Sequence, residues 1–369
     1  MANTTVPAEL VSNSVYERKN LIINGAMQVA QRATSVTASS SAVAIHTVDR
    51  FITETSGGSY DVQQSTDHPN GYKYSQKVTM SGAFTPSASQ YLIPFEQRIE
   101  GDSLQRLAYG TSDAKKLTLS FWIKSTKTGT YVVELSNNNS GGMRKYSQSY
   151  TISSADTWEH KTLTYAGDTS TAFEDGTASE LTLFWWMTAG TTYTSGTLAT
   201  AWENNTSANR AVGVPSSVAD NDSWQLTGVQ LEASDEATPF EHLTLDEDLT
   251  LCKRYYQQYS GIHAFPMWTY GRNNASTQFV LEKEMRSQPS CSYSGSLSDT
   301  GVASGKAAVY ESNWVAFSTL TFSQTSDESG NSKMIRMDTG HPANTFASNN
   351  VAVGIYFSDT FYLKFDAEI

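Results

Sequence analysis

Several short segments of the chain alternate apolar and polar residues with a period of two, the pattern of β-strands with one buried face. Residues 117–124 (LTLSFWIK) place Leu, Leu, Phe and Ile on one side and Thr, Ser, Trp and Lys on the other. Residues 131–135 (YVVEL) follow across a short turn, and residues 181–187 (LTLFWWM) alternate in the same way. We therefore expect strands here, with Trp185 facing a core and Trp186 facing outward.

Residues 224–231 (WQLTGVQL) change phase within one strand-like segment. The apolar residues Trp224 and Leu226 share one parity, whereas the apolar valine and leucine of the second half take the other. One inserted residue near Gly228 would return both sets to the same face, which is what a β-bulge does. A strand that is buried on both faces is the alternative interpretation.

One segment has a helical pattern instead. Apolar residues recur from Leu245 through Leu249 and Cys252 to Tyr256, which is the spacing of one helical face. Acidic residues crowd the first turn and basic residues lie near the end, as the helix dipole favours. The spacing predicts a single helix over 244–257.

This helix divides the chain into two β-rich parts. We expect a β-sandwich over 20–243, preceded by a polar arm over 1–19. Residues 258–369 contain short strand-like runs between polar turns, and the last run, 361–365, alternates Phe, Leu and Phe with Tyr and Lys. Such spacing indicates a smaller sandwich or barrel. No internal repeat is visible, which disfavours a β-helix.

Composition supports an all-β chain. Aromatic residues, which favour strands, make up 11% of the sequence, and only 17% of residues are charged. The net charge of −12 disfavours nucleic acid as a partner, because affinity there comes from basic side chains on phosphates. No apolar run approaches ~20 residues, so no membrane insertion is expected. The N-terminus lacks the pattern of a signal peptide, so we expect synthesis in a cytoplasm.

Four segments, in order, carry a family resemblance: NLIINGAMQVAQRATS with HTVDRF (20–35 and 46–51), LTLSFWIKS (117–125), WQLTGVQLE with ATPFEHL (224–243), and LCKRYYQQY (251–259). The set resembles tail-fibre and virion structural proteins of marine tailed bacteriophages, especially those that infect cyanobacteria. The first part is also similar to galactose-binding-like carbohydrate-binding modules. The resemblance implies an N-terminal jelly roll and a virion protein that contributes to host attachment through surface glycans.

The same resemblance implies partners. Fibres are usually three-fold, so we expect a homotrimer that contacts other virion proteins and a host cell-surface polysaccharide. Two alternatives remain open. One is a capsid decoration, head-fibre or tail adaptor protein with a purely structural role. The other is a secreted carbohydrate-binding module, which the absent signal peptide disfavours.

Motifs of enzyme active sites are absent from the sequence. No nucleophile elbow, HExxH or CxxC pair occurs, and the six histidines have no metal-ligand spacing. Cys252 and Cys291 lie in apolar contexts and are interpreted as buried small hydrophobes. We expect a protein without catalytic activity or cofactor. Because jelly rolls often hold structural calcium through oxygen ligands, Asp220 and Asp222 are weak calcium candidates.

Aromatic residues around a Gly/Thr-rich stretch are the candidate glycan-binding residues. Trp186, Tyr193 and Trp202 lie near this stretch, and Asn204 and Asn205 follow it. Sugars stack their C–H faces on exposed rings, and amides bind their hydroxyl groups. An outward Trp186 is thus a candidate stacking platform. A subunit contact and cover by a local loop are the alternatives.

Overall fold

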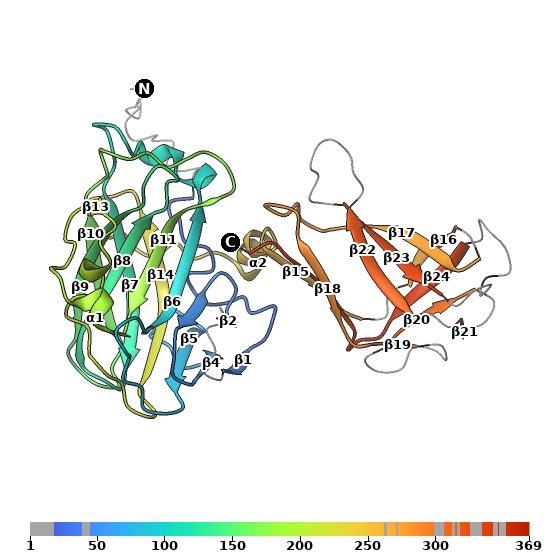
Figure 1. Ribbon diagram of the computed structural model, residues 1–369, viewed down its shortest axis with the longest axis horizontal. Coiled ribbons are helices and arrows are strands. Elements are labelled where there is room, and N and C mark those ends of the chain that lie inside the picture. Colours follow the sequence, from blue (N-terminus) through green and yellow to red (C-terminus); the bar gives the residue numbers. More distant parts are fainter. Residues whose placement is uncertain are drawn as a thin grey trace, which may run out of the picture. The chain divides into compact units, whose positions relative to one another are not determined.

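The computed structural model of the protein describes most of the chain. The described residues are 18–38, 45–261, 264–270, 272–298, 306–311, 314–315, 318–324, 334–341, 346 and 352–368. The polar arm expected over 1–19 therefore lies outside them except for its last two residues. The chain divides after Asp248 into two compact units, unit 1 up to that residue and unit 2 from Leu249 onward (Figure 1).

Unit 1 is a β-sandwich of two antiparallel sheets. In spatial order the first sheet contains β1 (Ser35–Ala38), β4 (Tyr60–Ser65), β5 (Ser75–Met80), β14 (Ser223–Glu232), β7 (Leu117–Ser125) and β10 (Glu159–Tyr165). The second contains β13 (Glu203–Asn204), β9 (Arg144–Ile152), β8 (Gly129–Asn137), β11 (Ser179–Trp186), β6 (Tyr91–Glu100), β3 (Ile52–Thr55) and β2 (Ile45–His46), with β12 (Thr188–Ala189) beside β6. The predicted all-β sandwich is confirmed.

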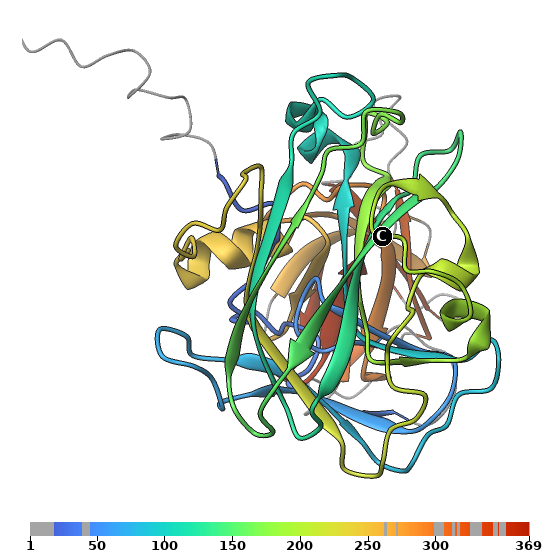
Figure 2. The ribbon, with the colours of Figure 1, turned by 90° about the vertical axis from the view of Figure 1, so that its left-hand side faces the viewer.

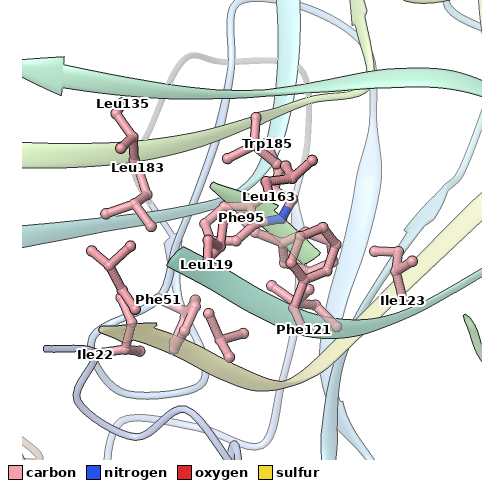
Figure 3. Close-up of a cluster of buried hydrophobic side chains, with 14 of the residues drawn as sticks. Ile22, Phe51, Phe95, Leu119, Phe121, Ile123, Leu135, Leu163, Leu183 and Trp185 are labelled. Carbon is pink, nitrogen blue, oxygen red and sulfur yellow. The ribbon is translucent and has the colours of Figure 1, made fainter. Parts of the chain in front are cut away.

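The core of unit 1 lies between the two sheets, and strand parity decides which side chains enter it (Figure 3). Leu119 and Phe121 of β7 meet Leu135 of β8 and Trp185 of β11 there, and all four are fully buried. Phe121 and Trp185 pack edge to face, with ring centroids 5.8 Å apart. Trp186 belongs to a separate cluster on the other side of its sheet. The predicted parity of both strands is confirmed.

The phase change in β14 is a β-bulge. The register of β14 against β7 shifts between Thr227 and Gln230, and Gly228 adopts a φ of +62°. The ring of Tyr72 lies where a Cβ at Gly228 would be, 2.6 Å from that position. Every residue of β14 is also buried. The predicted bulge is confirmed, and so is burial on both faces, because other segments cover the strand's second side.

Hydrogen bonds join the two ends of unit 1 in a cluster that we call the clasp: Lys19, Asn20, Gln230, Thr238 and Glu241. The Asn20 N–H donates to Oε2 of Glu241 (2.8 Å), and the Glu241 N–H donates to Oε1 of Gln230 (2.8 Å). Lys19 Nζ donates to Oγ1 of Thr238 (2.6 Å). Two of the four segments that carry the sequence resemblance, the first and the third, therefore meet at one place.

Unit 2 has two sheets around its own core. One contains β15 (Tyr256–Tyr259), β25 (Tyr362–Asp366) and β18 (Ser290–Ser294). The other contains β19 (Ser296–Ser298), β20 (Lys306–Tyr310), β24 (Ala352–Phe357), β16 (Ala264–Thr269), β17 (Asn274–Val280), β23 (Met334–Gly340) and β22 (Thr319–Gln324), with β21 (Trp314–Val315) beside β20. Phe361, Leu363 and Phe365 are buried, as the alternation of the last predicted strand requires.

The helix α2 (Leu245–Cys252) is shorter than the predicted helix over 244–257, which is a correction. Its start is a capping box, because the Thr244 N–H donates to the Glu247 carboxylate and the Glu247 N–H donates to the Thr244 hydroxyl. Tyr256 leaves the helical spacing because it begins β15 and pairs with β25. No helix within the described residues is long and apolar enough to span a bilayer.

Candidate functional site

Trp186 and Tyr193 lie together, but not as an exposed platform. The Trp186 side chain is only 1% exposed. The centroid of the Tyr193 ring lies 5.2 Å from that of the Trp186 ring, and the Arg210 guanidinium lies 4.8 Å from the Trp186 ring centroid. The segment that carries the short helix α1 (Thr191–Thr194), outside the strands in Figure 2, packs over this ring. The expected outward direction is correct. Of the alternatives for this ring, the structure shows cover by a local loop, which folds back and buries it, so Trp186 is not an exposed stacking platform.

The other predicted glycan-binding residues lie elsewhere in unit 1. Trp202 packs edge to face on Tyr109 at 5.9 Å, and its indole N–H donates to a backbone carbonyl. Asn204 is exposed, and its side-chain oxygen accepts a hydrogen bond from Arg144 (3.2 Å). Asn205 is exposed beside it. Trp202 packs against the main core, whereas Trp186 belongs to the outer cluster, so the predicted set does not form one site.

The two calcium candidates lie in one tight turn before β14. Asp222 Oδ2 accepts the Ala219 N–H (2.7 Å) and lies 3.7 Å from Lys127 Nζ. Asp220 accepts a hydrogen bond from the side chain of Asn221 (3.0 Å). In the part of the chain that the structure describes, no group of three or more His, Cys, Asp or Glu side chains could hold a metal ion. The Asp222 carboxylate instead stabilises the turn through its bond to the backbone.

The structure points to a different candidate site, the side of the second sheet that faces away from the core, here called the outer face. Glu96 of β6, Phe184 of β11 and Glu134 of β8 form a row across three neighbouring strands. They do so because Phe184 pairs in register with both glutamates. Each of the three is adjacent in its strand to a core residue, so parity directs it outward.

Glu134 is the centre of a buried charge network. Its carboxylate accepts two hydrogen bonds from Arg210, at 2.9 and 2.7 Å, in a bidentate geometry. Lys145 Nζ lies 3.6 Å from the same carboxylate, and both side chains are at most 5% exposed. Burial lowers the pKa of Lys145 to about 8, although the attraction of Glu134 opposes this change. The network holds the Arg210 guanidinium in one orientation.

Glu96 is the second buried carboxylate of the outer face. One oxygen accepts a hydrogen bond from Nε of Arg98 (2.5 Å), and the other has no hydrogen-bond donor. Burial raises the pKa of Glu96 to about 7. The Arg98 guanidinium opposes this change, and the Glu54 carboxylate adds to it. The hydroxyl of Tyr91 donates to Glu54. Burial therefore favours the protonated form of Glu96 over the charged form.

The outer face presents aromatic rings and guanidinium groups to solvent. Phe184, Tyr91 and Tyr193 are half-buried, and Arg98 is 33% exposed in its side chain. The Arg210 guanidinium lies 5.5 Å from the Phe184 ring centroid and 5.7 Å from that of Tyr193. Stacking of this kind immobilises both the rings and the cation. The face thus combines fixed apolar surfaces with fixed hydrogen-bond donors.

Sequence reasoning missed the glutamates of this face, although a signal was present. Glu134 lies within YVVEL and Glu96 within YLIPFEQRIE, so each is a carboxylate inside an apolar strand. A charged residue in such a strand is rarely buried unless it is paired. That signal identifies each residue as unusual, but it does not show that the two lie on one face.

No protein-family model and no curated protein matches the sequence. Among solved structures, the chain is similar to the enzymatically active domain of a bacteriophage CBA120 tailspike protein, with 13% identity, a TM-score of 0.30 and 58% of this chain covered. The match spans 21% of that tailspike chain.

Two carbohydrate-binding modules are similar at a comparable level, and each is covered completely. One is TmCBM61 in complex with β-1,4-galactotriose, with 9% identity, a TM-score of 0.29 and 59% of this chain covered. The other is the family 11 module from Clostridium thermocellum in complex with a mixed-linked tetrasaccharide, with 10% identity, a TM-score of 0.28 and 56% covered. Similarities at these values carry no functional argument. Function is instead inferred from the residues of the outer face.

Proposed function

We propose that unit 1 binds a glycan on its outer face, and that the protein is a non-catalytic, tail-fibre-like virion protein of a tailed phage that contributes to host attachment. One observation carries the proposal of glycan binding. Phe184, a half-buried ring, lies in register between two buried carboxylates, each of which fixes an arginine. Aromatic rings and planar charged groups held in fixed positions are suited to pyranose rings and their hydroxyl groups.

The chemistry of the ligand follows from this arrangement. The C–H faces of a sugar ring pack on Phe184 and on the edge of the Tyr91 and Tyr193 cluster. The guanidinium groups of Arg98 and Arg210 donate hydrogen bonds to hydroxyl or carboxylate oxygens.

The positions of the two carboxylates favour binding without catalysis. A general acid or a nucleophile must reach the substrate within hydrogen-bonding distance. The side chains of Glu96 and Glu134 are both 0% exposed, and Glu134 is already engaged by Arg210 and Lys145. These carboxylates position the arginines instead of presenting an oxygen to a glycosidic bond.

A glycan array with the full chain tests the binding proposal, followed by titration of the best glycan. Phe184→Ala and Arg98→Ala should each weaken binding about tenfold or more, which is about 1.4 kcal/mol. Met143→Ala, which truncates an exposed apolar side chain of the same unit, is the matched control. If both outer-face variants retained the wild-type melting temperature and bound as tightly as the control, the outer face would not be the site.

The virion role rests on the sequence resemblance, and the expected homotrimer belongs to the same proposal. Light scattering coupled to size exclusion should give about three times the 40.4 kDa chain mass. Several copies per particle would compensate for weak single-site affinity, because linked sites act at high effective concentration. Mass spectrometry of purified particles should detect the chain. Its absence from particles, together with glycan binding by the isolated protein, would favour a binding module outside the virion.

A further inference from the structure

The wall of unit 2 is interrupted between two strands, at a place that we call the seam. Within the described residues, β18 pairs only with β25, and β22 pairs only with β23. Both strands are therefore at the edge of their sheets (Figure 1). Residues from both of them line a hollow of about 610 Å³. Its walls are residues 288–289 and 291–293, in and just before β18, and residues 320–323 of β22.

Within the strands β18 and β22 themselves, the features that protect natural edge strands from pairing are missing; the nearest one is Pro289, which lines the seam just before β18. Proteins usually protect such edges with lysine, inward-pointing charges, proline or bulges. The sequences of β18 (SCSYS) and β22 (TLTFSQ) contain no charged residue and no proline, and the residues that line the seam include no charged side chain. An unprotected edge is a template for another strand. Two such edges face one hollow here.

The floor of the seam suits side chains at alternating positions. Leu320 and Phe322, two residues apart on β22, pack toward the core of unit 2. Tyr293 of β18 stacks on Phe361, with ring centroids 5.4 Å apart. Cys291, two residues before Tyr293, is partly buried against the same core. An extended strand presents every second side chain to one face, so its apolar residues would meet this floor.

We propose that the seam binds an extended, uncharged polypeptide segment with apolar side chains at alternate positions, which pairs with the β18 and β22 edges by strand addition. Main-chain hydrogen bonds to the two edges supply the affinity, and the apolar floor sets the register. The inserted strand joins the two sheets of unit 2 into one continuous wall. This proposal is independent of glycan binding, which belongs to unit 1.

A labelled hexapeptide tests the proposal, with the sequence of β22 itself, Thr-Leu-Thr-Phe-Ser-Gln, and blocked termini. It is uncharged and alternates apolar residues, so fluorescence anisotropy should show saturable binding to the full chain. A control peptide with proline in place of the central threonine keeps the apolar residues but loses a main-chain donor, and it should bind about tenfold more weakly. Binding should also slow alkylation of Cys291, which lines the seam, whereas Cys252 is buried.

Protein variants locate the binding. Ser292→Lys and Thr321→Lys place a charge on each edge and should weaken peptide binding about tenfold or more. Gln278→Lys adds the same charge to an exposed position of β17, in the interior of its sheet, and should bind as the wild type does. Thermal unfolding of all three variants confirms that unit 2 is folded.

The oligomeric state identifies the source of the strand. The wild type could bind no peptide and still be an oligomer. If Ser292→Lys and Thr321→Lys then dissociate this oligomer, whereas Gln278→Lys leaves it intact, a second copy supplies the strand. The proposal would be overturned if the wild type bound no peptide and the two edge variants had the same oligomeric state as the control. Equal binding of the proline peptide would overturn it as well, because the affinity would then not come from main-chain pairing.

Discussion

Truncation of Trp186 separates a structural role from a ligand-stacking role. The ring is 1% exposed and packs against Tyr193 and Arg210. Trp186→Ala removes a large buried side chain, so unit 1 should lose about 3–5 kcal/mol of unfolding free energy. For a unit of this size, each kcal/mol corresponds to about 2–4 °C, so the thermal midpoint should fall by roughly 6–20 °C.

Trp186→Phe is the matched control, because the indole N–H has no hydrogen-bond partner. Phenylalanine keeps an aromatic ring in the cluster and removes only an unpaired polar group, so most of the stability should remain. Calorimetry of the full chain follows the two units as separate transitions, and only that of unit 1 should move. If Trp186→Ala left this transition unchanged but abolished glycan binding, the ring would be a ligand platform and our account of its burial would be wrong.

Three further changes have expected outcomes. A Cβ at Gly25 would lie 2.2 Å from the Val229 carbonyl oxygen, so Gly25→Ala should cost on the order of 2 kcal/mol in urea unfolding, and an unchanged midpoint would contradict this contact. Because the folded-state pKa of Glu96, about 7, exceeds its ordinary value of 4.5, folding binds a proton between these pH values. The stability of unit 1 should therefore fall by on the order of 3 kcal/mol from pH 4.5 to 7, and denaturation across this range should show that Glu96→Gln removes the fall. Arg210→Ala leaves Glu134 buried without its bidentate partner and should cost about 3–5 kcal/mol in thermal unfolding, part of which Glu134→Gln in the same chain should restore.

Local pattern was sufficient for much of the fold. The parity of residues 117–124 gave the core side of β7, and the phase change around Gly228 gave the bulge, because both are properties of a single strand. The end of α2 was not predictable in this way. Tyr256 fits a helical face by spacing, but its pairing with Asp366 in β25 lies more than a hundred residues away in the sequence. Long-range pairing therefore decides whether such a residue is helical or extended.

The candidate site depended even more on tertiary structure. Parity correctly directed Trp186 outward, but the loop that covers it is held there by long-range contacts, among them that between Trp186 and Arg210. Glu96 and Glu134 become neighbours of one ring because β11 lies between β6 and β8, and this strand order is not evident from either strand alone. Sequence could mark each glutamate as unusual, but it could not bring them together.

The clasp has a mechanical consequence. Asn20 and Glu241, which lie near opposite ends of unit 1 in the sequence, are joined directly by a hydrogen bond. A tensile force applied to the two connections of this unit would therefore load the few bonds between residues 19–20 and 238–241 first, before it reached the sheets. The sandwich and its outer face would keep their shape while the clasp held. A domain built in this way can be placed in series within a longer assembly and still present an undistorted surface under tension.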